Sequence, residues 1–205
     1  MGLSAGNQHN DSDIRLALRR QKLQRFDEDA NSLVIDELGL AHARSRIDVA
    51  VLNGCLHGYE IKSERDTLDR LQRQLETYRR TLSRLTYVCS SKHVARTLEE
   101  TPQWCGVIEA KRGQRGGVIF KTQRRTKSNP DIEPIMLAHL LWRQEAIRIL
   151  IARGVESRQL KKPRVELYEQ ICEMLPVRAL IQEIRLAISQ RDMWRDLPAQ
   201  LSYGD

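Results

Sequence analysis

The sequence predicts an α/β domain followed by a helical module. Over residues 12–128, short apolar runs typical of strands alternate with amphipathic helical patterns, as in α/β proteins. An Asn53-Gly54 pair lies between two of these runs and is a strong signal for a β-hairpin. The composition changes at Ser128-Asn129-Pro130, and after Glu133 every pattern is helical. We therefore expect a domain over residues 12–128 and a helical module over residues 129–205.

The N-terminal part is expected to form a tail and a basic helix. Residues 1–11 are rich in Gly, Ser, Asn and Asp, and we expect them to be disordered. Ser12 or Asp13 can cap a helix that runs to about Phe26. One face of this helix is basic and is either a solvated surface or a phosphate-contacting one. Its members are Arg15, Arg19, Arg20, Lys22 and Arg25.

Three strands and a turn are expected next. The apolar patterns predict strands over residues 32–40, 46–52 and 56–62, with a turn at 41–45, which gives an antiparallel meander. Side chains alternate between the two faces of a strand. Glu60 and Lys62 therefore share one face, Ile61 points into the core, and the hairpin brings Asp48 close to Glu60.

The remaining elements follow from periodicity. The domain is expected to continue with a helix, a strand, a helix and two strands, at residues 65–82, 85–90, 92–100, 104–110 and 117–122. Three helices are expected in the C-terminal module, at residues 133–152, 163–175 and 176–191. Their apolar stripes pack on each other, on the domain, or on a second copy of the chain or another protein.

Two acids and a lysine meet in the predicted hairpin. Asp48 and Glu60 offer carboxylate oxygens, which are the ligands that Mg²⁺ prefers. A bound metal polarises a phosphate and lowers the pKa of a water, and Lys62 can orient that water or stabilise charge on the phosphate. Glu37, on the preceding strand, can reach the metal directly or through water. The alternative is an ordinary ion pair on an exposed strand, with Glu37 facing solvent.

The order of these residues resembles a known nuclease core. Asp48 followed about a dozen residues later by Glu60-Ile61-Lys62 resembles the PD-(D/E)XK superfamily, and Gln74 with Tyr78 resembles the Q-x-x-x-Y helix of its RecB-like members. The motifs R-I-D-V-A, G-Y-E-I-K-S and D-T-L-x-R-L are similar to those of a little-characterised bacterial group of small members; they lie at residues 46–50, 58–63 and 66–71. The proline that gives the superfamily its name is replaced by Ile47.

The resemblance implies a fold and a chemistry. The fold is a restriction-endonuclease-like mixed sheet with an α-β-β-β-α-β core and helices on both sides. The activity is phosphodiester hydrolysis with Mg²⁺ or Mn²⁺, held by Asp48, Glu60 and the backbone carbonyl of Ile61, with Glu37 in support. The catalytic set is Asp48, Glu60, Lys62, Glu37, Gln74 and Tyr78.

Gln74, Tyr78 and Arg46 each have more than one possible role. Gln74 and Tyr78 are four residues apart on one helix face, where they would orient the site or contact the nucleic-acid backbone. Tyr78 fits the apolar stripe of its helix equally well. Arg46 lies two residues before Asp48 and would meet either a phosphate or the Glu37 carboxylate.

The charge balance favours an anionic partner. The formal net charge is +7 and the pI is about 9.5, so nucleic acid is the first candidate, with DNA expected and RNA left open. Residues 111–127 contain seven basic residues and no acid, and form either a phosphate-contacting surface or a solvated loop. The nucleic-acid contacts expected there are Lys111, Arg112, Arg115, Arg124 and Arg125.

Other classes of protein find little support. The four cysteines form no C-x-x-C pair, which argues against a zinc knuckle and fits a reducing, cytoplasmic location. No signal peptide, membrane-spanning run or Gly-x-Ser-x-Gly motif is present. Two alternatives to a nuclease stay open. One is a nucleic-acid-binding protein that keeps the fold without cutting, and the other is an interaction module that recruits a partner enzyme.

Overall fold

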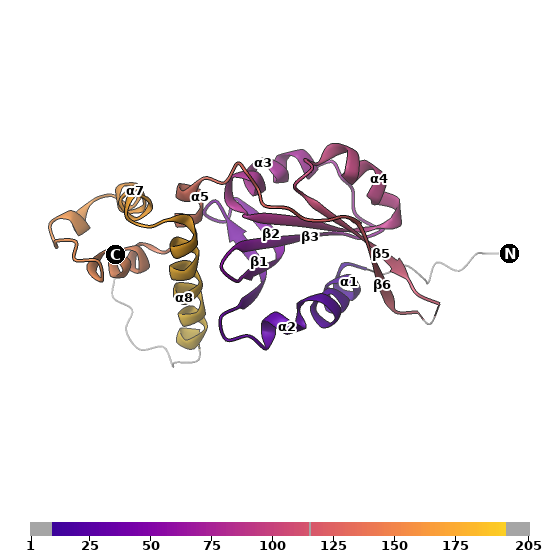
Figure 1. The fold of residues 1–205 in the computed structure, drawn as a ribbon, viewed down its shortest axis with the longest axis horizontal. Helices are drawn as coiled ribbons and strands as arrows, with labels where there is room; N and C mark the ends of the chain where they lie inside the picture. The colour runs from indigo at the N-terminus through magenta and orange to yellow at the C-terminus, as the bar shows by residue number, and fades with distance from the viewer. Residues whose placement is uncertain (1–9, 115, 196–205) are drawn as a thin grey trace. The chain divides into compact units, whose positions relative to one another are not determined.

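A computed structural model of the protein describes residues 10–114 and 116–195. Its centre is a six-stranded mixed sheet in the order β1-β2-β3-β4-β5-β6 (Figure 1). Strands β1 to β3 form the predicted antiparallel meander, β3, β4 and β5 are parallel, and β6 is antiparallel to β5. The expected α/β class with a mixed sheet is confirmed. The strands are Leu33–Leu40, Ser45–Leu52, Leu56–Lys62, Arg84–Ser90, Gly106–Arg112 and Val118–Arg124.

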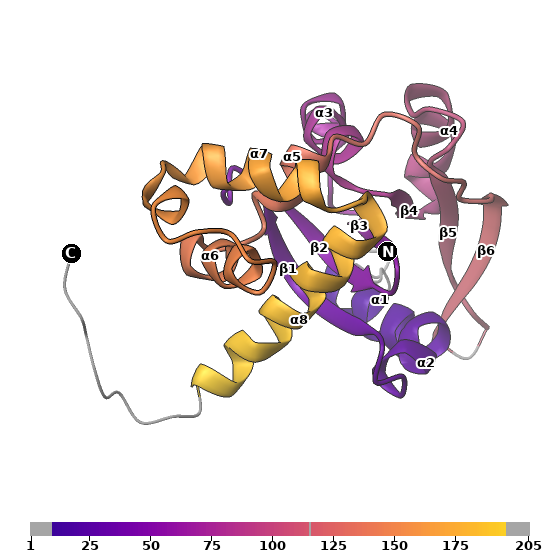
Figure 2. The ribbon, with the colours of Figure 1, turned by 60° about the vertical axis from the view of Figure 1, so that its left-hand side comes forward.

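Helices cover both faces of the sheet. Parallel strands need a crossover connection, and α3 (Leu71–Thr81) and α4 (Ser91–Glu100) provide those from β3 to β4 and from β4 to β5. Both crossover helices lie on one side of the sheet, and the N-terminal helix lies on the other (Figures 1 and 2). The helix expected over residues 65–82 begins only at Leu71, because Ser63 and Asp66 close a turn before it. The Ser63 amide donates to Asp66 Oδ2 at 2.7 Å.

The N-terminal helix begins earlier than expected. Asn10, rather than Ser12 or Asp13, is its cap: Asn10 Oδ1 accepts from the Asp13 amide at 2.9 Å, and Asp13 Oδ2 accepts from the Asn10 amide at 3.2 Å. This reciprocal pair satisfies two amides that a helix start leaves free. The helix consists of α1 (Asp11–Leu18), a π-helical segment (Arg19–Leu23) and α2 (Gln24–Asp27). The expected tail therefore ends before Asn10, and residues 1–9 lie outside the described part.

One apolar core of the domain lies between the N-terminal helix and the sheet. Ile61 belongs to it and is only 3 % exposed, as its position between Glu60 and Lys62 predicted. Each buried Leu, Ile or Val side chain contributes roughly 1.5–3 kcal/mol to folding. Because strand residues alternate, this burial turns Glu60 and Lys62 to the opposite face, toward α3. The core also contains Ile14, Leu18, Leu23, Val49, Val51, Tyr59 and Val88.

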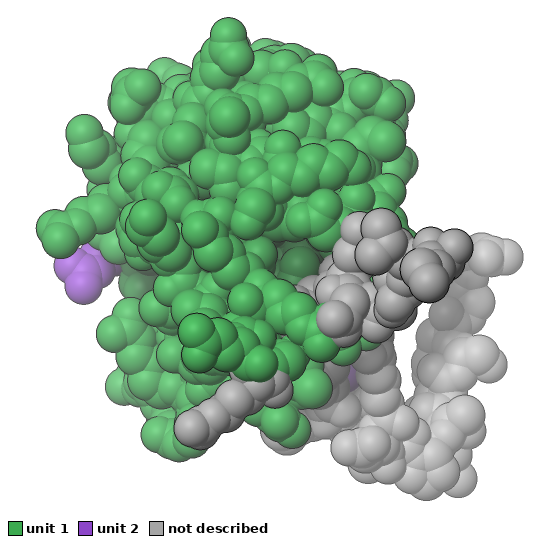
Figure 3. Space-filling model, turned by 90° about the vertical axis from the view of Figure 1, so that its right-hand side faces the viewer, with its two compact units in different colours: residues 1–133 green, residues 134–205 purple. Residues whose placement is uncertain are grey.

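The chain divides into two compact units, residues 1–133 and 134–205, which are coloured separately in Figure 3. The domain boundary expected after residue 128 precedes this division. Asn129 is held by the first unit, since its side-chain amide donates to the carbonyl oxygens of Arg79 at 2.6 Å and Leu82 at 2.7 Å. Residues 129–133 thus complete the first unit.

The second unit is entirely helical in its described part. It contains α5 (Pro134–Ala138), α6 (Arg143–Ile151), α7 (Arg164–Met174), α8 (Val177–Arg195) and a short 3₁₀ turn at Gln159–Lys161. The single helix expected over residues 133–152 is two helices. Trp142 has an extended backbone, and its amide donates to Glu145 Oε2 at 2.7 Å, which starts a new helix at Arg143. None of the described helices in either unit has the length and apolarity required to cross a membrane.

Candidate active site

The predicted acids lie where β2 and β3 separate. The ladder between these strands runs from Leu52 and Leu56 to Val49 and Tyr59, and it ends there. The next position on β2 is Asp48, whose Oδ2 accepts a hydrogen bond from the Ile61 amide at 2.6 Å. A side chain thus replaces the backbone partner that the Ile61 amide lacks, and it holds the Asp48 carboxylate beside the Glu60–Lys62 segment.

Glu60 is the centre of a buried polar network. It is 2 % exposed, and both of its oxygens accept hydrogen bonds. Oε1 accepts from Lys62 Nζ at 2.9 Å and from Gln74 Nε2 at 2.8 Å, and Oε2 accepts from the Tyr78 hydroxyl at 2.7 Å. Lys62 Nζ also donates to Gln74 Oε1 at 3.2 Å. A buried charge pair needs such partners, so four predicted site residues form one cluster on β3 and α3.

Tyr78 lies in the apolar stripe of its helix and also makes polar contacts through its hydroxyl. Its ring is completely buried, and its single hydroxyl proton is shared between two acceptors, Glu60 Oε2 at 2.7 Å and the Arg46 carbonyl oxygen at 2.6 Å. Burial and the neighbouring Glu60 charge raise the pKa of Tyr78 well above its usual value. The phenol therefore stays protonated and serves as a permanent donor.

Removing this hydroxyl is expected to destabilise the protein. In Tyr78→Phe the buried Glu60 Oε2 and the Arg46 carbonyl lose a donor, which is expected to lower the free energy of unfolding by about 1–3 kcal/mol in urea titrations. Tyr87→Phe is the matched control, because the buried Tyr87 hydroxyl has no hydrogen-bond partner within the described residues. Equal losses in the two variants would contradict the role given to the Tyr78 hydroxyl.

Asp48 carries an unfavourable charge. Burial and the nearby Glu60 charge raise its pKa from 3.8 to about 7, against the lowering effects of the Ile61 amide and Arg15. A divalent cation would neutralise the two acids, and the donor set of two carboxylates and the Ile61 carbonyl suits Mg²⁺ or Mn²⁺. Among the described residues, no three His, Cys, Asp or Glu side chains are grouped for one metal. Waters would therefore complete the coordination.

Glu37 lies opposite Asp48 on β1 and is held by arginines. Its backbone is left-handed, with φ 57°, and pairing of β1 with β2 is interrupted at this residue. Glu37 Oε1 lies 2.5 Å from Arg15 Nη1, and Oε2 lies 3.5 Å from Arg46 Nη1. The ion pair with Arg46 is the alternative expected for these two residues. A water-mediated role of Glu37 at the metal stays a prediction.

Arg15 is a site residue that its sequence context did not single out. Its Nη2 lies 3.7 Å from Asp48 Oδ1, and its Nη1 donates to the Asp48 carbonyl at 3.3 Å. The sequence placed it only on a basic helix face. The sequence signal for its location was its position directly after the buried Ile14. A residue beside the apolar stripe of a helix lies at the edge of the face that packs on the sheet.

A polar groove of about 610 Å³ opens beside Asp48 and Gln74. One wall is the turn and strand start at residues 43–46, and the other is the face of α3 that carries Gln74. Arginines stand on both walls, and only one of them was predicted as a nucleic-acid contact. They are Arg44, Arg46, Arg70 and Arg73. Arg70, Arg73 and Thr77 share a helix face with Gln74, so spacing along α3 could have found them.

The basic hairpin of β5 and β6 is less available than expected. Arg124 is occupied by the structure: its Nε donates to the Cys105 carbonyl at 2.7 Å, and its Nη1 donates to the Leu98 carbonyl at 3.1 Å. Carbonyls near the end of a helix lack partners in the helix itself, and Arg124 fills that need at the end of α4. We therefore remove Arg124 from the expected nucleic-acid contacts.

The other hairpin residues differ in their surroundings. Lys111 Nζ lies 3.1 Å from Glu109 Oε1. Arg112 and Arg125 have exposed side chains, and Arg115 lies outside the described residues. Their expected contacts with nucleic acid stay predictions.

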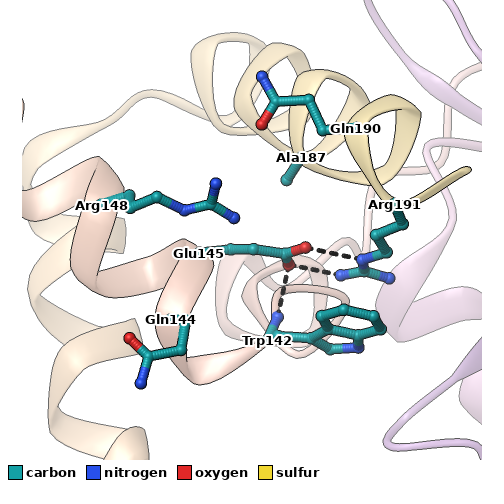
Figure 4. Close-up of a pocket in the computed structure, with 7 residues that line it drawn as sticks. All are labelled: Trp142, Gln144, Glu145, Arg148, Ala187, Gln190 and Arg191. Carbon is teal, nitrogen blue, oxygen red and sulfur yellow. Dashed lines mark hydrogen bonds and ion pairs between the residues drawn. The ribbon is translucent and has the colours of Figure 1, made fainter. Parts of the chain in front are cut away.

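The helical unit has its own pocket of about 380 Å³ between α6 and α8 (Figure 4). Arg191 stacks over the Trp142 ring, with 4.2 Å from its Cζ to the ring centroid, and its Nε donates to Glu145 Oε1 at 2.7 Å. Trp142 remains 60 % exposed, and Arg148 extends beside the pocket. The ion pair holds α6 to α8, and nothing in the pocket repeats the chemistry of the acid–lysine cluster.

Fold and site together define an α/β protein with a buried acid–lysine cluster beside an arginine-lined groove. The chain belongs to the bacteriophage P4 protein cII family, which it matches over residues 5–197. It is 25 % identical to Protein cII of Enterobacteria phage P4 over 156 residues, which are 76 % of this chain and 56 % of that protein. The chain thus spans about half the length of this curated relative.

One solved structure is similar at low sequence identity. It is SPO1766, a protein of unknown function from Silicibacter pomeroyi, with a TM-score of 0.42 and 17 % identity. The similarity covers 75 % of this chain and 94 % of that one.

Proposed function

We propose that this protein is a metal-dependent nuclease of the PD-(D/E)XK type that hydrolyses phosphodiester bonds in DNA. The observation that carries the proposal is the cluster of Glu60, Lys62, Gln74 and Tyr78 beside Asp48, at the point where β2 and β3 separate. Each of these residues belongs to the motif that resembles the nuclease core, and the fold brings them together.

The residues divide the chemistry among them. Asp48, Glu60 and the Ile61 carbonyl would hold Mg²⁺ or Mn²⁺, which supplies a water of lowered pKa and polarises the scissile phosphate. Lys62 donates toward that water and toward the phosphate as negative charge builds on it. Gln74 and Tyr78 fix Glu60 and Lys62 in place. Water attacks phosphorus, one P–O ester bond breaks, and the leaving oxygen takes a proton.

The buried lysine favours catalysis over simple binding. A buried ion pair contributes little to stability, and apolar residues of similar volume are often as stable or more stable. A protein that only bound nucleic acid would gain nothing from keeping Lys62 and Glu60 buried together. The non-cleaving alternative is therefore the second choice, and an interaction module that recruits a partner enzyme is the third.

The setting of this activity is also part of the proposal. The cysteines at positions 55, 89, 105 and 172 are free thiols, which supports a reducing, cytoplasmic location. DNA is preferred to RNA as the substrate. The exposed Trp142 beside the pocket of the helical unit supports contact with a second copy or a protein partner there.

Metal dependence provides the direct test. We expect the protein to nick or degrade DNA in Mg²⁺ or Mn²⁺, to lose this activity in EDTA, and to regain it when the metal is added back. Gel analysis of a supercoiled plasmid and of a labelled single strand measures both substrates. Retention of DNA without cleavage in any metal would favour the binding alternative, and cleavage that persists in EDTA would remove the metal from the mechanism.

A further inference from the structure

We propose that the arginine-lined groove binds one strand of nucleic acid through its phosphates and leads that strand to the acid–lysine cluster. The direction toward Asp48 rests on the proposed nuclease function, whereas strand binding stands on the groove itself. Asp48 and Gln74 lie in the lining together with Arg44 and Arg46 on one wall and Arg70 and Arg73 on the other.

Of the four groove arginines, Arg46 pairs with Glu37, and the other three have no charged partner among the described residues. Arg44, Arg70 and Arg73 are exposed and have no ion pair or side-chain hydrogen bond with any described residue. Two other arginines of the α3 region are paired: Arg79 Nε lies 3.5 Å from Glu76 Oε2, and Arg80 Nε lies 2.7 Å from Glu133 Oε1. The same helix thus neutralises its arginines elsewhere and leaves them unpaired at the groove, which is the charge pattern of an anion-binding surface.

The turn that forms one wall adopts an unfavourable backbone. Ala41, His42 and Ala43 have φ values of 49°, 57° and 62°, in the left-handed region that residues other than glycine rarely adopt. Each such residue costs on the order of 1 kcal/mol or more, and such residues concentrate at ligand sites. This turn carries Arg44 directly into the groove, next to Ser45 and Arg46.

The dimensions of the groove favour one strand over a duplex. About 610 Å³ is the volume of a small-ligand pocket, so it takes a short stretch of one backbone between two cationic walls. Among the described residues, no aromatic side chain lines the groove. Without side chains that stack on bases or hydrogen-bond to base edges, the groove would recognise the phosphates, and binding would be independent of sequence.

The test is binding in EDTA, where cleavage does not interfere. Fluorescence anisotropy with labelled single-stranded and duplex oligonucleotides compares wild type, Arg70→Gln/Arg73→Gln, and the control Arg79→Gln/Arg80→Gln, which removes equal charge from the same region. We expect the groove variant to bind the single strand about tenfold or more weakly, and its salt slope to fall by about 1.4, since each phosphate contact contributes about 0.7. The control is expected to bind like wild type.

Several outcomes would overturn the proposal. The proposal fails if the groove variant binds as tightly as wild type, or if the groove and control variants lose equal affinity. It also fails if wild type binds a duplex as tightly as the single strand, or binds neither at low salt. Arg44→Gln/Arg46→Gln changes the opposite wall and replaces the first variant if that one fails to fold. If the groove variant loses strand binding but the wild type cleaves DNA in no metal, the nuclease function is rejected and strand binding by the groove is retained. If the wild type cleaves DNA but the groove variants bind as it does, the nuclease function is retained and strand binding by the groove is rejected.

Discussion

Lys62→Met is expected to bind DNA and to cleave it roughly 100-fold or more slowly than wild type, the usual loss for one catalytic donor in a buried site. Lys62 Nζ lies 2.9 Å from Glu60 Oε1, inside the buried polar cluster. Methionine keeps most of the side-chain volume and removes only the charge and the donors. Glu60 retains Gln74 and Tyr78 as donors, so the cluster keeps most of its hydrogen bonds.

The matched control is Lys92→Met. Lys92 is exposed, and its Nζ donates to the carbonyl of Glu64 at 2.8 Å. Glu64 is close to Lys62 in the sequence, but this contact lies outside the acid cluster. Single-turnover cleavage in Mn²⁺, anisotropy in EDTA and a thermal melt separate chemistry, binding and folding. Cleavage by Lys62→Met at the rate of the control would remove the lysine from the mechanism.

The sequence predicted the parts of the site that local geometry determines. Asp48, Glu60 and Lys62 lie on one hairpin, which Asn53-Gly54 predicted, although its loop has three residues and pairs Leu52 with Leu56. Gln74 and Tyr78 are one helical turn apart, so they necessarily share a face, and α3 packs that face over Glu60.

Residues that depend on long-range packing were harder to predict. Arg15 meets Asp48 from a helix far away in the chain, and its place beside the buried Ile14 is a weak signal, since Arg19 likewise follows the buried Leu18. Arg124 looked like part of a basic surface, yet carbonyls near the end of α4 bind it. The break between α5 and α6 depends on the bond from the Trp142 amide to Glu145, which competes with an uninterrupted apolar periodicity.

Asp48→Asn is expected to be more stable than wild type at pH 8, although it removes a proposed metal ligand. The pKa of Asp48 is raised from 3.8 to about 7 in the folded protein. Between these values the folded state binds more protons than the unfolded state, so stability falls as the pH rises from about 4 to about 7. The full shift corresponds to at most about 4 kcal/mol. Asparagine carries no charge and can still accept from the Ile61 amide through its side-chain oxygen.

Urea unfolding from pH 4 to pH 8 measures this difference. The gap between Asp48→Asn and wild type is expected to open through pH 4 to 7 and to stay constant above it, whereas Asp36→Asn, at an exposed acid on the same sheet, should follow wild type. A wild type that gains stability over Asp48→Asn as the pH rises would contradict an unfavourable Asp48 charge in the folded protein, which Arg15 only partly offsets. Mg²⁺ or Mn²⁺ at pH 8 is expected to stabilise wild type more than the variant, because the ion binds the folded acid pair and offsets its repulsion. The Asp48 charge would thus lower the stability of the metal-free protein, and the bound ion would restore it. This is the behaviour expected of a site selected for metal chemistry rather than for stability.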